Sequence, residues 1–567
     1  MSDKTEEDIV SVTEPLPPES DDGNVEYKQQ LLNVDDERLE QLATQMNYRL
    51  SEGYGECIYE IAIHDSGVPL GLSPEHMDES LRTLEKICAK IDAVMTLTTR
   101  KIISRKKEPV KEIAEVLIRE DRGKKFVHTK ICALGSVDHG KSTLLGVLTN
   151  GVLDNGNGSA RSTICTLKHE LQTGKTSSIG MHIMGFDAHG NPISSADRFK
   201  SLTWEEITSK SRKVVTFIDL CGHRDYLRTT IKGVSGTLPD YAMIVIEGSG
   251  GITDMTIEHI KLCGIYRIPF FIVVTKVDIA PPDKLKETIT ELKRLPKTMR
   301  IRNRISSQIK DNDDIAFCIK NFKSFDGVVP IIPYLKISSK TGEGLDNLRS
   351  FINLLPPRRP TGVSDDPDDA EFSVLNTYWV HGVGTIVHGN LLNGRINTGQ
   401  KLWLGPDSTG NFRKVHVKSI HFKRNLVDTS TAIDDYCYAL RDVSRSSIRK
   451  GMFMMATKDG LSIAKRMKCE LIIQTHHTTI KPGYEAQMHL DNINQQVSLV
   501  SILRYKRPRD EEWQDVNDGD DSYLRSGVRS EVIFEFKYNP ENVKVGSRFL
   551  TREGKTMAFG SVLELLD

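Results

Sequence analysis

The chain has 567 residues, which is too long for a single hydrophobic core and predicts about three to five domains. Its 77 acidic and 76 basic side chains give a net charge of −1, so any nucleic-acid site must be a local patch. The nine cysteines form no C-x-x-C pair and no cluster at metal-ligand spacing, which argues against a disulfide scaffold and indicates reduced thiols in an intracellular compartment.

We expect no targeting or membrane segment. The sequence starts MSDKTEEDIV, which lacks the apolar region of a signal peptide. The longest apolar stretch, PFFIVVT at 269–275, is far below the roughly 18 residues that span a bilayer. We therefore expect a soluble, cytoplasmic protein without a membrane partner.

The N-terminal part divides into two ranges. Residues 1–45 are rich in Asp, Glu, Ser and Pro, which predicts an acidic, disordered tail. Residues 46–124 have a globular composition, which predicts an extra α+β region without evident chemistry. In it we expect a strand at 57–63, a segment at 110–120 that fits either a helix or a strand, and a helix capped by Ser73 with Pro74 at its first position. That helix carries its apolar residues along one face, at Met77, Leu81, Leu84, Ile87 and Ile91.

Residues 125–358 alternate short apolar runs with helix-like segments, which predicts a parallel sheet covered on both faces. The apolar runs are FVHTKICAL, KVVTFIDL, DYAMIVIEG, FFIVVT and IIPYLKIS. A linker follows at 354–370. The short alternating strands and glycine-rich turns beyond it predict two all-β barrels, at 371–460 and 465–567.

A phosphate-binding motif follows the first of these strands. GSVDHGKST at 135–143 satisfies G-x-x-x-x-G-K-[ST], whose glycines let backbone N–H groups face phosphates at a helix N-terminus. We expect Lys141 to bridge the β- and γ-phosphates and the Ser142 hydroxyl to bind Mg²⁺. The candidate phosphate-binding residues are Gly135, Ser136, Val137, Asp138, His139, Gly140, Lys141, Ser142 and Thr143.

Two further segments complete the expected phosphate end. DLCG at 219–222 ends the second strand, so Asp219 is expected to hold Mg²⁺ and the Gly222 N–H to contact the γ-phosphate. A second Mg²⁺ ligand should come from LQTGKTSSIG at 171–180. The candidate is Thr176, with Thr173 and Ser177 as alternatives.

Two motifs predict a guanine site. TKVD at 275–278 places Lys276 over a purine ring and lets the Asp278 carboxylate accept two hydrogen bonds that guanine can donate and adenine cannot. Thr275 stands where Asn is usual, and its hydroxyl can still tie this loop to the phosphate loop. SSK at 338–340 offers backbone N–H groups to the guanine oxygen, through Ser338, Ser339 and Lys340. The four motifs in order predict a GTP-binding α/β P-loop domain.

The sequence resembles the translational GTPases. GSVDHGKST, DLCGH and GITDMTIEHI are similar to their G-domain motifs, and VHGVGTIVHGNLLNGRINTGQKLWLGP at 380–406 is similar to their second-domain barrel. The likeness covers about residues 125–567. TGKTSSIGMHIMGFDAHGN, VVTFIDLCGHRDYLRTT and the N-terminal region most resemble the GTP-binding protein 1/2 family. Cys221 stands where most translational GTPases have proline.

The resemblance implies a reaction and its partners. His223 would position the water that attacks the γ-phosphate, Val137 would gate that histidine, and Asp138 would help to bind a monovalent cation. The implied function is a GTPase whose GTP form binds aminoacyl-tRNA or a related RNA, with hydrolysis stimulated by the ribosome. The basic runs 294–304, 413–424 and 504–509 are candidate RNA contacts, and solvated surface explains each of them equally well.

One alternative stays open, and another is disfavoured. The chain could be a GTP-switched adaptor that recruits RNA-decay or quality-control factors through residues 1–124, with hydrolysis as a timer. A Ras-like signalling protein without RNA is disfavoured by the two predicted barrels.

Overall fold

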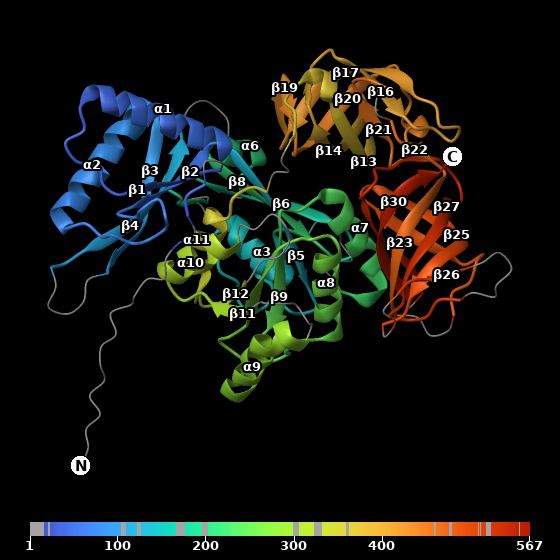
Figure 1. Cartoon of the computed structure of the whole chain (residues 1–567), viewed down its shortest axis with the longest axis horizontal. Helices are drawn as coiled ribbons and strands as arrows, with labels where there is room; N and C mark the ends of the chain where they lie inside the picture. The colour runs from blue at the N-terminus through green and yellow to red at the C-terminus, as the bar shows by residue number, and fades with distance from the viewer. Residues whose placement is uncertain are drawn as a thin grey trace.

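The structure, a computed structural model, contains an N-terminal domain, a large α/β domain and two β-barrels (Figure 1). No helix among the residues it describes is both long and apolar enough to cross a membrane. The described residues are 16, 18–20, 23–103, 109–121, 126–165, 170, 176–194, 202–298, 305–322, 331–358, 362–458, 461–475, 479–508, 510, 512–516, 523–554 and 556–566.

The N-terminal domain is a four-stranded sheet of order β1-β2-β4-β3, and helices α1 and α2 bury their apolar residues against it. Ser73 caps α2 as expected, since its hydroxyl accepts the N–H of His76 at 3.3 Å. The segment at 110–120, which fitted either a helix or a strand, forms a strand. The elements are β1 (Val25–Lys28), α1 (Asp36–Glu52), β2 (Glu56–Ile61), α2 (Pro74–Lys90), β3 (Ala93–Ile102) and β4 (Glu112–Glu120).

The expectation of a disordered tail over residues 1–45 is wrong for its second half. Strand β1 and the first turns of α1 lie inside that range. The Asp35 side chain caps α1 by accepting the N–H of Arg38 at 2.8 Å, and Leu31 and Leu42 are buried in the domain core. The average composition of the range concealed these few apolar residues. Residues 1–15 lie outside the described part.

The α/β domain is built on an eight-stranded sheet of order β11-β12-β10-β9-β5-β8-β6-β7. The five predicted apolar runs form its central parallel strands, and β6 and β7 are antiparallel additions. The strands are β5 (Val127–Gly135), β6 (Gly180–Phe186), β7 (Pro192–Ile193), β8 (Lys213–Asp219), β9 (Tyr241–Glu247), β10 (Phe270–Thr275), β11 (Ile305–Gln308) and β12 (Ile331–Lys336).

Helices cover both faces of this sheet, which explains why its central strands are apolar throughout. One core contains residues of α3, α10 and α11, and the other contains residues of α7, α8 and α9. The helices are α3 (Lys141–Asn150), α4 (Ser159–Ser162), α6 (Trp204–Lys210), η1 (Arg224–Tyr226), α7 (Leu227–Thr237), α8 (Asp254–Ile265), α9 (Pro282–Thr298), α10 (Asn312–Phe322) and α11 (Leu345–Leu354).

Two closed antiparallel barrels follow. In the first, the order β16-β21-β13-β14-β20-β17 closes through pairing of β16 with β17. In the second, β24-β29-β30-β23-β27-β25 closes through β24 and β25. The elements are η2 (Pro367–Asp369), β13 (Glu371–Val380), β14 (Gly384–Asn393), β15 (Arg395–Asn397), β16 (Lys401–Gly405), β17 (Arg413–Phe422), β18 (Asn425–Val427), β19 (Thr429–Thr431), β20 (Asp435–Arg441), η3 (Arg445–Ser447), β21 (Phe453–Met455), β22 (Ile463–Ala464), β23 (Arg466–Thr475), β24 (Glu485–Leu490), β25 (Ile493–Lys506), β26 (Gln514–Asp515), β27 (Arg529–Phe536), β28 (Glu541–Asn542), β29 (Arg548–Glu553) and β30 (Thr556–Leu566).

The α/β domain contacts all three other domains. On the N-terminal side, the buried Lys213 ammonium lies 3.2 Å from a Glu56 oxygen and donates to the Leu355 carbonyl at 2.6 Å. On the first barrel's side, the His128 ring contacts Asp434 at 2.5 Å. The second barrel packs on α7 and α8 through a small apolar core. Its buried members are Leu227, Ile231, Leu262, Ile265, Leu550 and Met557.

Candidate nucleotide-binding site

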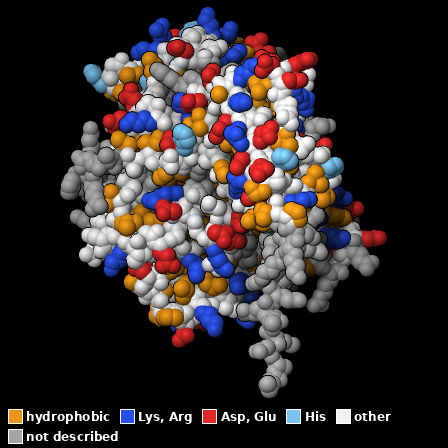
Figure 2. Space-filling model, turned by 90° about the vertical axis from the view of Figure 1, so that its left-hand side faces the viewer, with side chains coloured by type: hydrophobic (Ala, Val, Ile, Leu, Met, Phe, Trp, Pro, Cys, Tyr) orange, Lys and Arg blue, Asp and Glu red, His pale blue; other side chains and the backbone are white. Residues whose placement is uncertain are grey.

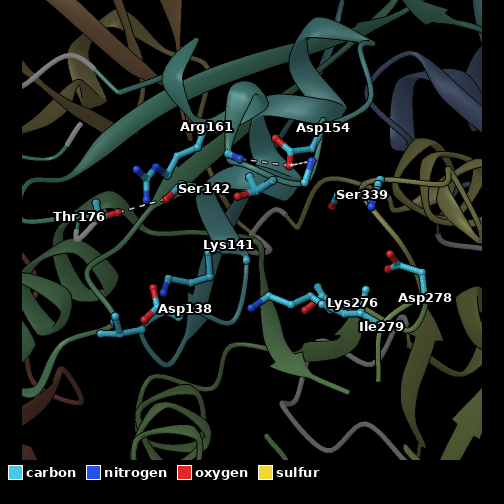
Figure 3. A pocket seen from close by; sticks show the side chains of 18 of the residues that line it. Asp138, Lys141, Ser142, Asp154, Arg161, Thr176, Lys276, Asp278, Ile279 and Ser339 are labelled. Atoms are coloured by element: carbon cyan, nitrogen blue, oxygen red, sulfur yellow. Dashed lines mark hydrogen bonds between the residues drawn. The ribbon is translucent and has the colours of Figure 1, made fainter. Parts of the chain in front are cut away.

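A cavity of about 400 Å³ opens at the carboxyl edge of the parallel strands. This volume lies within the usual range of ligand pockets, and this edge is where open α/β sheets bind ligands. Figure 3 shows that side chains from several loops point into it. Of the predicted residues, those that line the cavity are Val137, Asp138, Gly140, Lys141, Ser142, Thr143, Thr176, Gly222, His223, Thr275, Lys276, Asp278, Ser339 and Lys340.

The phosphate loop has the backbone that its glycines allow. Gly140 adopts a φ of 83°, in the left-handed region that favours glycine, and α3 begins at the next residue. The Lys141 ammonium donates to the carbonyls of Gly135 at 2.9 Å and Ser136 at 3.0 Å. Burial lowers the pKa of Lys141. The Lys141 side chain lies at the N-terminus of α3, and an ammonium group at a helix N-terminus is an arrangement that binds phosphate.

Three oxygens from separate segments meet beside this loop. The Ser142 hydroxyl donates to Asp219 at 2.7 Å and lies 3.1 Å from the Thr176 hydroxyl. The second carboxylate oxygen of Asp219, Oδ1, is buried and has no hydrogen-bond partner among the described residues. Burial raises the pKa of this carboxyl group. Two hydroxyls and a carboxylate are oxygen ligands of the kind that Mg²⁺ prefers, and the orphaned oxygen fits a cation site.

The structure describes two of the three candidates for the second hydroxyl. Thr176 is the one that approaches Ser142. The Ser177 hydroxyl instead donates to the carboxylate of Glu170 at 2.9 Å. Thr173 lies outside the described residues.

Gly222 fills a position with no room for a side chain. A Cβ atom there would lie 2.4 Å from the Lys141 ammonium and 2.5 Å from the Gly135 carbonyl oxygen. Its neighbour His223 also lines the cavity, and its side chain is 32% exposed. The His223 Nδ1 atom accepts the N–H of Asp225 at 3.2 Å, which leaves Nε2 as the ring nitrogen that residue 225 does not engage.

The opposite end of the cavity carries the TKVD and SSK segments. The Thr275 hydroxyl donates to the His139 carbonyl at 2.7 Å, which is the tie between the two loops expected for this hydroxyl. The Lys276 ammonium lies 3.3 Å from Glu247. Asp278 is exposed at the cavity, so its carboxylate is accessible to a ligand.

Five predicted residues do not line the cavity. The buried Asp219 meets the site through its hydrogen bond with Ser142. The Gly135 and Ser136 carbonyls hold Lys141. The buried His139 ring turns away, to 3.2 Å from the Val245 carbonyl, and burial lowers its pKa. The buried Ser338 hydroxyl accepts the N–H groups of Lys340 and Thr341, so it shapes the loop.

Five lining residues were missed by the sequence reasoning. Ile279 follows the TKVD motif and is 65% exposed. The others, Asp154, Gly156, Gly158 and Arg161, come from one segment between α3 and the Thr176 region. The glycine-rich run DNGNG at 154–158 was the available signal, since such runs often lie at ligands.

Comparison with known sequences identifies relatives along nearly the whole chain. Residues 127–358 match the family model described as the elongation factor Tu GTP binding domain. The chain is 38% identical to GTP-binding protein 1 of Xenopus laevis, over 98% of this chain and 80% of that protein. It is 36% identical to GTP-binding protein 2 of Mus musculus, over 97% of this chain and 88% of that protein.

Comparison with solved structures supports the fold. The translation elongation factor SelB from Methanococcus maripaludis, in complex with the GTP analogue GppNHp, aligns with a TM-score of 0.52. The alignment covers 78% of this chain and 80% of that one, at 18% identity. At this identity the likeness supports only the architecture, an elongation-factor-like GTPase domain followed by two barrels.

Proposed function

The chain belongs to the GTP-binding protein 1/2 family, and we propose that its GTP form binds aminoacyl-tRNA or a related RNA and hydrolyses GTP when a ribosome engages it. It is a GTP hydrolase with an elongation-factor-like core. On this proposal the chain acts in the cytoplasm, where ribosomes and aminoacyl-tRNA meet.

The cavity is the proposed seat of GTP. Lys141, the backbone of residues 135–143 and the Gly222 N–H bind the phosphates, while Asp278, Lys276 and the backbone of residues 338–340 bind guanine. Asp278 is exposed to solvent, whereas Gly222 is packed so closely against Lys141 and Gly135 that no side chain fits there. This difference supports a nucleotide with its base at Asp278 and its phosphates at Gly222.

Mg²⁺ is the proposed cofactor, with Ser142, Thr176 and Asp219 as its protein ligands. The support is the meeting of their oxygens and the unpartnered Asp219 Oδ1 within the described part of the chain. When bound, the ion would neutralise charge on the β- and γ-phosphates. We also propose that Asp138, which lines the cavity, helps to bind a monovalent cation beside the phosphates.

His223 is the proposed residue that positions the attacking water. It lines the cavity next to Gly222, and its backbone begins the 3-10 turn η1 that leads into α7. Movement of α7 would therefore reorient the ring. Val137, on the facing loop, is the proposed apolar gate. This arrangement links hydrolysis to whatever contacts α7.

A cluster of cations around α7 is the observation that carries the RNA part of the proposal. Arg224, Arg228 and Lys232 recur every four residues, and Lys450 and Arg552 join them from the two barrels. Burial and Lys450 lower the pKa of Lys232. The pKa of Arg552 is also lowered, first by burial and then by Arg228 and Arg224, against an opposing influence of Glu258.

Such crowding of like charges is unfavourable unless a polyanion binds there. No ion pair within the described residues joins any of these five side chains to a carboxylate. The cluster includes residues of three domains, so a bound phosphate backbone would sense their relative positions. An RNA fits this cluster better than an acidic protein does, since RNA offers phosphates at regular spacing.

The first test measures GTP turnover with and without ribosomes plus aminoacyl-tRNA, in wild type and His223→Ala. The proposal expects strong stimulation of wild type that disappears in the variant. In parallel, the GTP-loaded protein should bind aminoacyl-tRNA more tightly than the GDP-loaded protein. The slope of log affinity against log salt concentration should become shallower by about one in Arg228→Ala and by about one in Lys450→Ala, because each variant loses one phosphate contact. Equal RNA affinity of the two nucleotide forms would reject the proposal. Unstimulated, equally slow turnover in both proteins would favour the adaptor for RNA-decay factors.

A further inference from the structure

The segment 151–162 reaches along the cavity, and the proposed function gives it no role. It connects α3 to α4 and contributes Asp154, Gly156, Gly158 and Arg161 to the cavity wall. Contacts with the rest of the domain fix it at two points. The Asp154 N–H donates to the Ser339 carbonyl at 2.9 Å, in the proposed guanine loop. Ala160 packs on α3, where a Cβ at Gly146 would lie 2.1 Å from the Ala160 carbonyl oxygen.

The Asp154 carboxylate holds this segment in shape. It accepts the N–H groups of Gly156 at 2.8 Å, Gly158 at 3.3 Å and Ala160 at 2.9 Å, together with the Ser159 hydroxyl at 3.3 Å. Burial works to raise the pKa of Asp154, but these hydrogen bonds outweigh burial and lower it. An ionised carboxylate with four donors makes a rigid turn. The turn delivers the residue that follows it, Arg161, to a fixed place.

Arg161 points into the cavity at its phosphate end. Figure 3 shows its side chain extending toward the region where Ser142 and Thr176 meet, while Lys141 enters from the other side of Ser142. Arg161 is half-buried in α4 and lines the cavity. A guanidinium group presents several N–H donors in a planar fork that matches two phosphate oxygens.

We propose that Arg161 binds the phosphate oxygens of the nucleotide opposite Lys141, and that Asp154 positions it for that contact. This inference rests on the proposed function, because it takes the cavity to be the GTP site. It assigns Arg161 as a substrate-binding residue and Asp154 as a positioning residue. GTP would then be held from two sides by cations on separate segments.

The test compares GTP and GDP dissociation constants, measured by calorimetry in the presence of Mg²⁺. Arg161→Ala should raise both constants by about tenfold to a hundredfold, the range for a lost charge-assisted contact. Arg161→Lys should recover part of the loss, since it keeps the charge without the fork. Asp154→Asn should shift binding in the same direction, and should add little when combined with Arg161→Ala. Arg82→Ala, at an exposed site of α2, is the matched control.

A parallel variant separates failure of this inference from failure of the site. Asp278→Asn should exchange GTP preference for XTP if the cavity is the guanine site. If it does so while Arg161→Ala binds GTP and GDP like wild type, the role of Arg161 is refuted and the site stands. If Asp278→Asn does not change base preference, the cavity is misassigned and the inference falls with it. Thermal unfolding of each variant shows whether a lost affinity reflects a lost fold.

Discussion

On the proposed assignment of the guanine site, base selection depends on the single carboxylate of Asp278, which lines the cavity. Because guanine offers two donors on one edge, replacing this carboxylate by an amide leaves one donor of guanine facing another donor. We expect Asp278→Asn to weaken GTP binding by about 1–3 kcal/mol, or roughly fivefold to 150-fold, and to strengthen XTP binding. Competition between the two nucleotides for the purified protein measures the exchange. Unchanged GTP affinity would place the guanine site elsewhere.

Gly222 is closely packed against Lys141 and the phosphate loop. A methyl group there would meet the Lys141 ammonium at 2.4 Å and backbone at 2.5 Å, so Gly222→Ala must displace Lys141 or the phosphate loop. Overpacking of this kind costs about 1–3 kcal/mol. We expect a lower melting temperature and weakened GTP binding, measured by thermal unfolding and calorimetry.

Gly264 provides the matched control for this substitution. It is exposed in α8, and a Cβ atom there meets nothing within 4 Å. Gly264→Ala should stabilise the protein by up to about 1 kcal/mol through helix propensity and should leave GTP binding unchanged. Equal effects of the two substitutions would mean that the contacts at Gly222 do not matter.

At the level of elements, the sequence predicted what depends on local periodicity. The five apolar runs became the central strands because a sheet covered on both faces requires continuous apolar residues, and each ligand motif ends or follows one of them. Strand β6 escaped prediction because it is an antiparallel strand whose first residues are only partly buried. The cavity wall at 154–161 also escaped prediction, since its geometry comes from hydrogen bonds to Asp154 rather than from any repeat.

Lys213, the first residue of β8, should make the stability of the protein depend on pH. Burial lowers the pKa of Lys213 from 10.5 to about 8, against the opposing influence of Glu56. Because the folded pKa is below the unfolded one, the unfolded chain binds more protons between pH 8 and 10.5, so stability rises with pH in that window. We expect the free energy of unfolding of wild type to gain up to about 3 kcal/mol relative to Lys213→Met across it.

Denaturant unfolding at several pH values measures this difference. The control is Lys286→Met, which removes an exposed lysine of α9. Its difference from wild type should stay nearly flat over the same range. A flat difference for Lys213→Met as well would show that Lys213 titrates like an exposed lysine and that the interface around it is open to water.

The N-terminal domain is built into the GTPase rather than appended to it. Glu56 contacts Lys213 at 3.2 Å and Arg119 at 3.2 Å, and Arg119 donates to the Asn353 carbonyl at 2.9 Å. These side chains are buried. No sequence pattern predicts this contact, because Arg119 and Asn353 are 234 positions apart and buried charges lack a periodic signature.

The outer surface of the N-terminal domain differs from its buried contact with the α/β domain in the distribution of charged side chains. In Figure 2, which faces the N-terminal side, acidic and basic side chains are intermixed over the visible surface. Such a mixed surface does not favour a polyanion, in contrast to the cation cluster around α7. A protein partner for residues 1–124, as the adaptor alternative requires, would therefore be sought on this face.

Deleting residues 1–124 would not test that alternative cleanly, because it removes Glu56 and Arg119 and leaves Lys213 without its carboxylate. The single change Glu56→Ala already leaves Arg119 and Lys213 without their carboxylate partner. We therefore expect it to destabilise the protein by about 3–5 kcal/mol. The control Glu75→Ala, at an exposed site of α2, should change stability by less than about 0.5 kcal/mol. Thermal and denaturant unfolding compare the two.

If Glu56→Ala is as stable as Glu75→Ala, the domain is separable, and its deletion becomes a valid test of recruitment. If Glu56→Ala unfolds readily, loss of activity on deletion reports loss of the fold, and partner recruitment must be tested with substitutions on the exposed face.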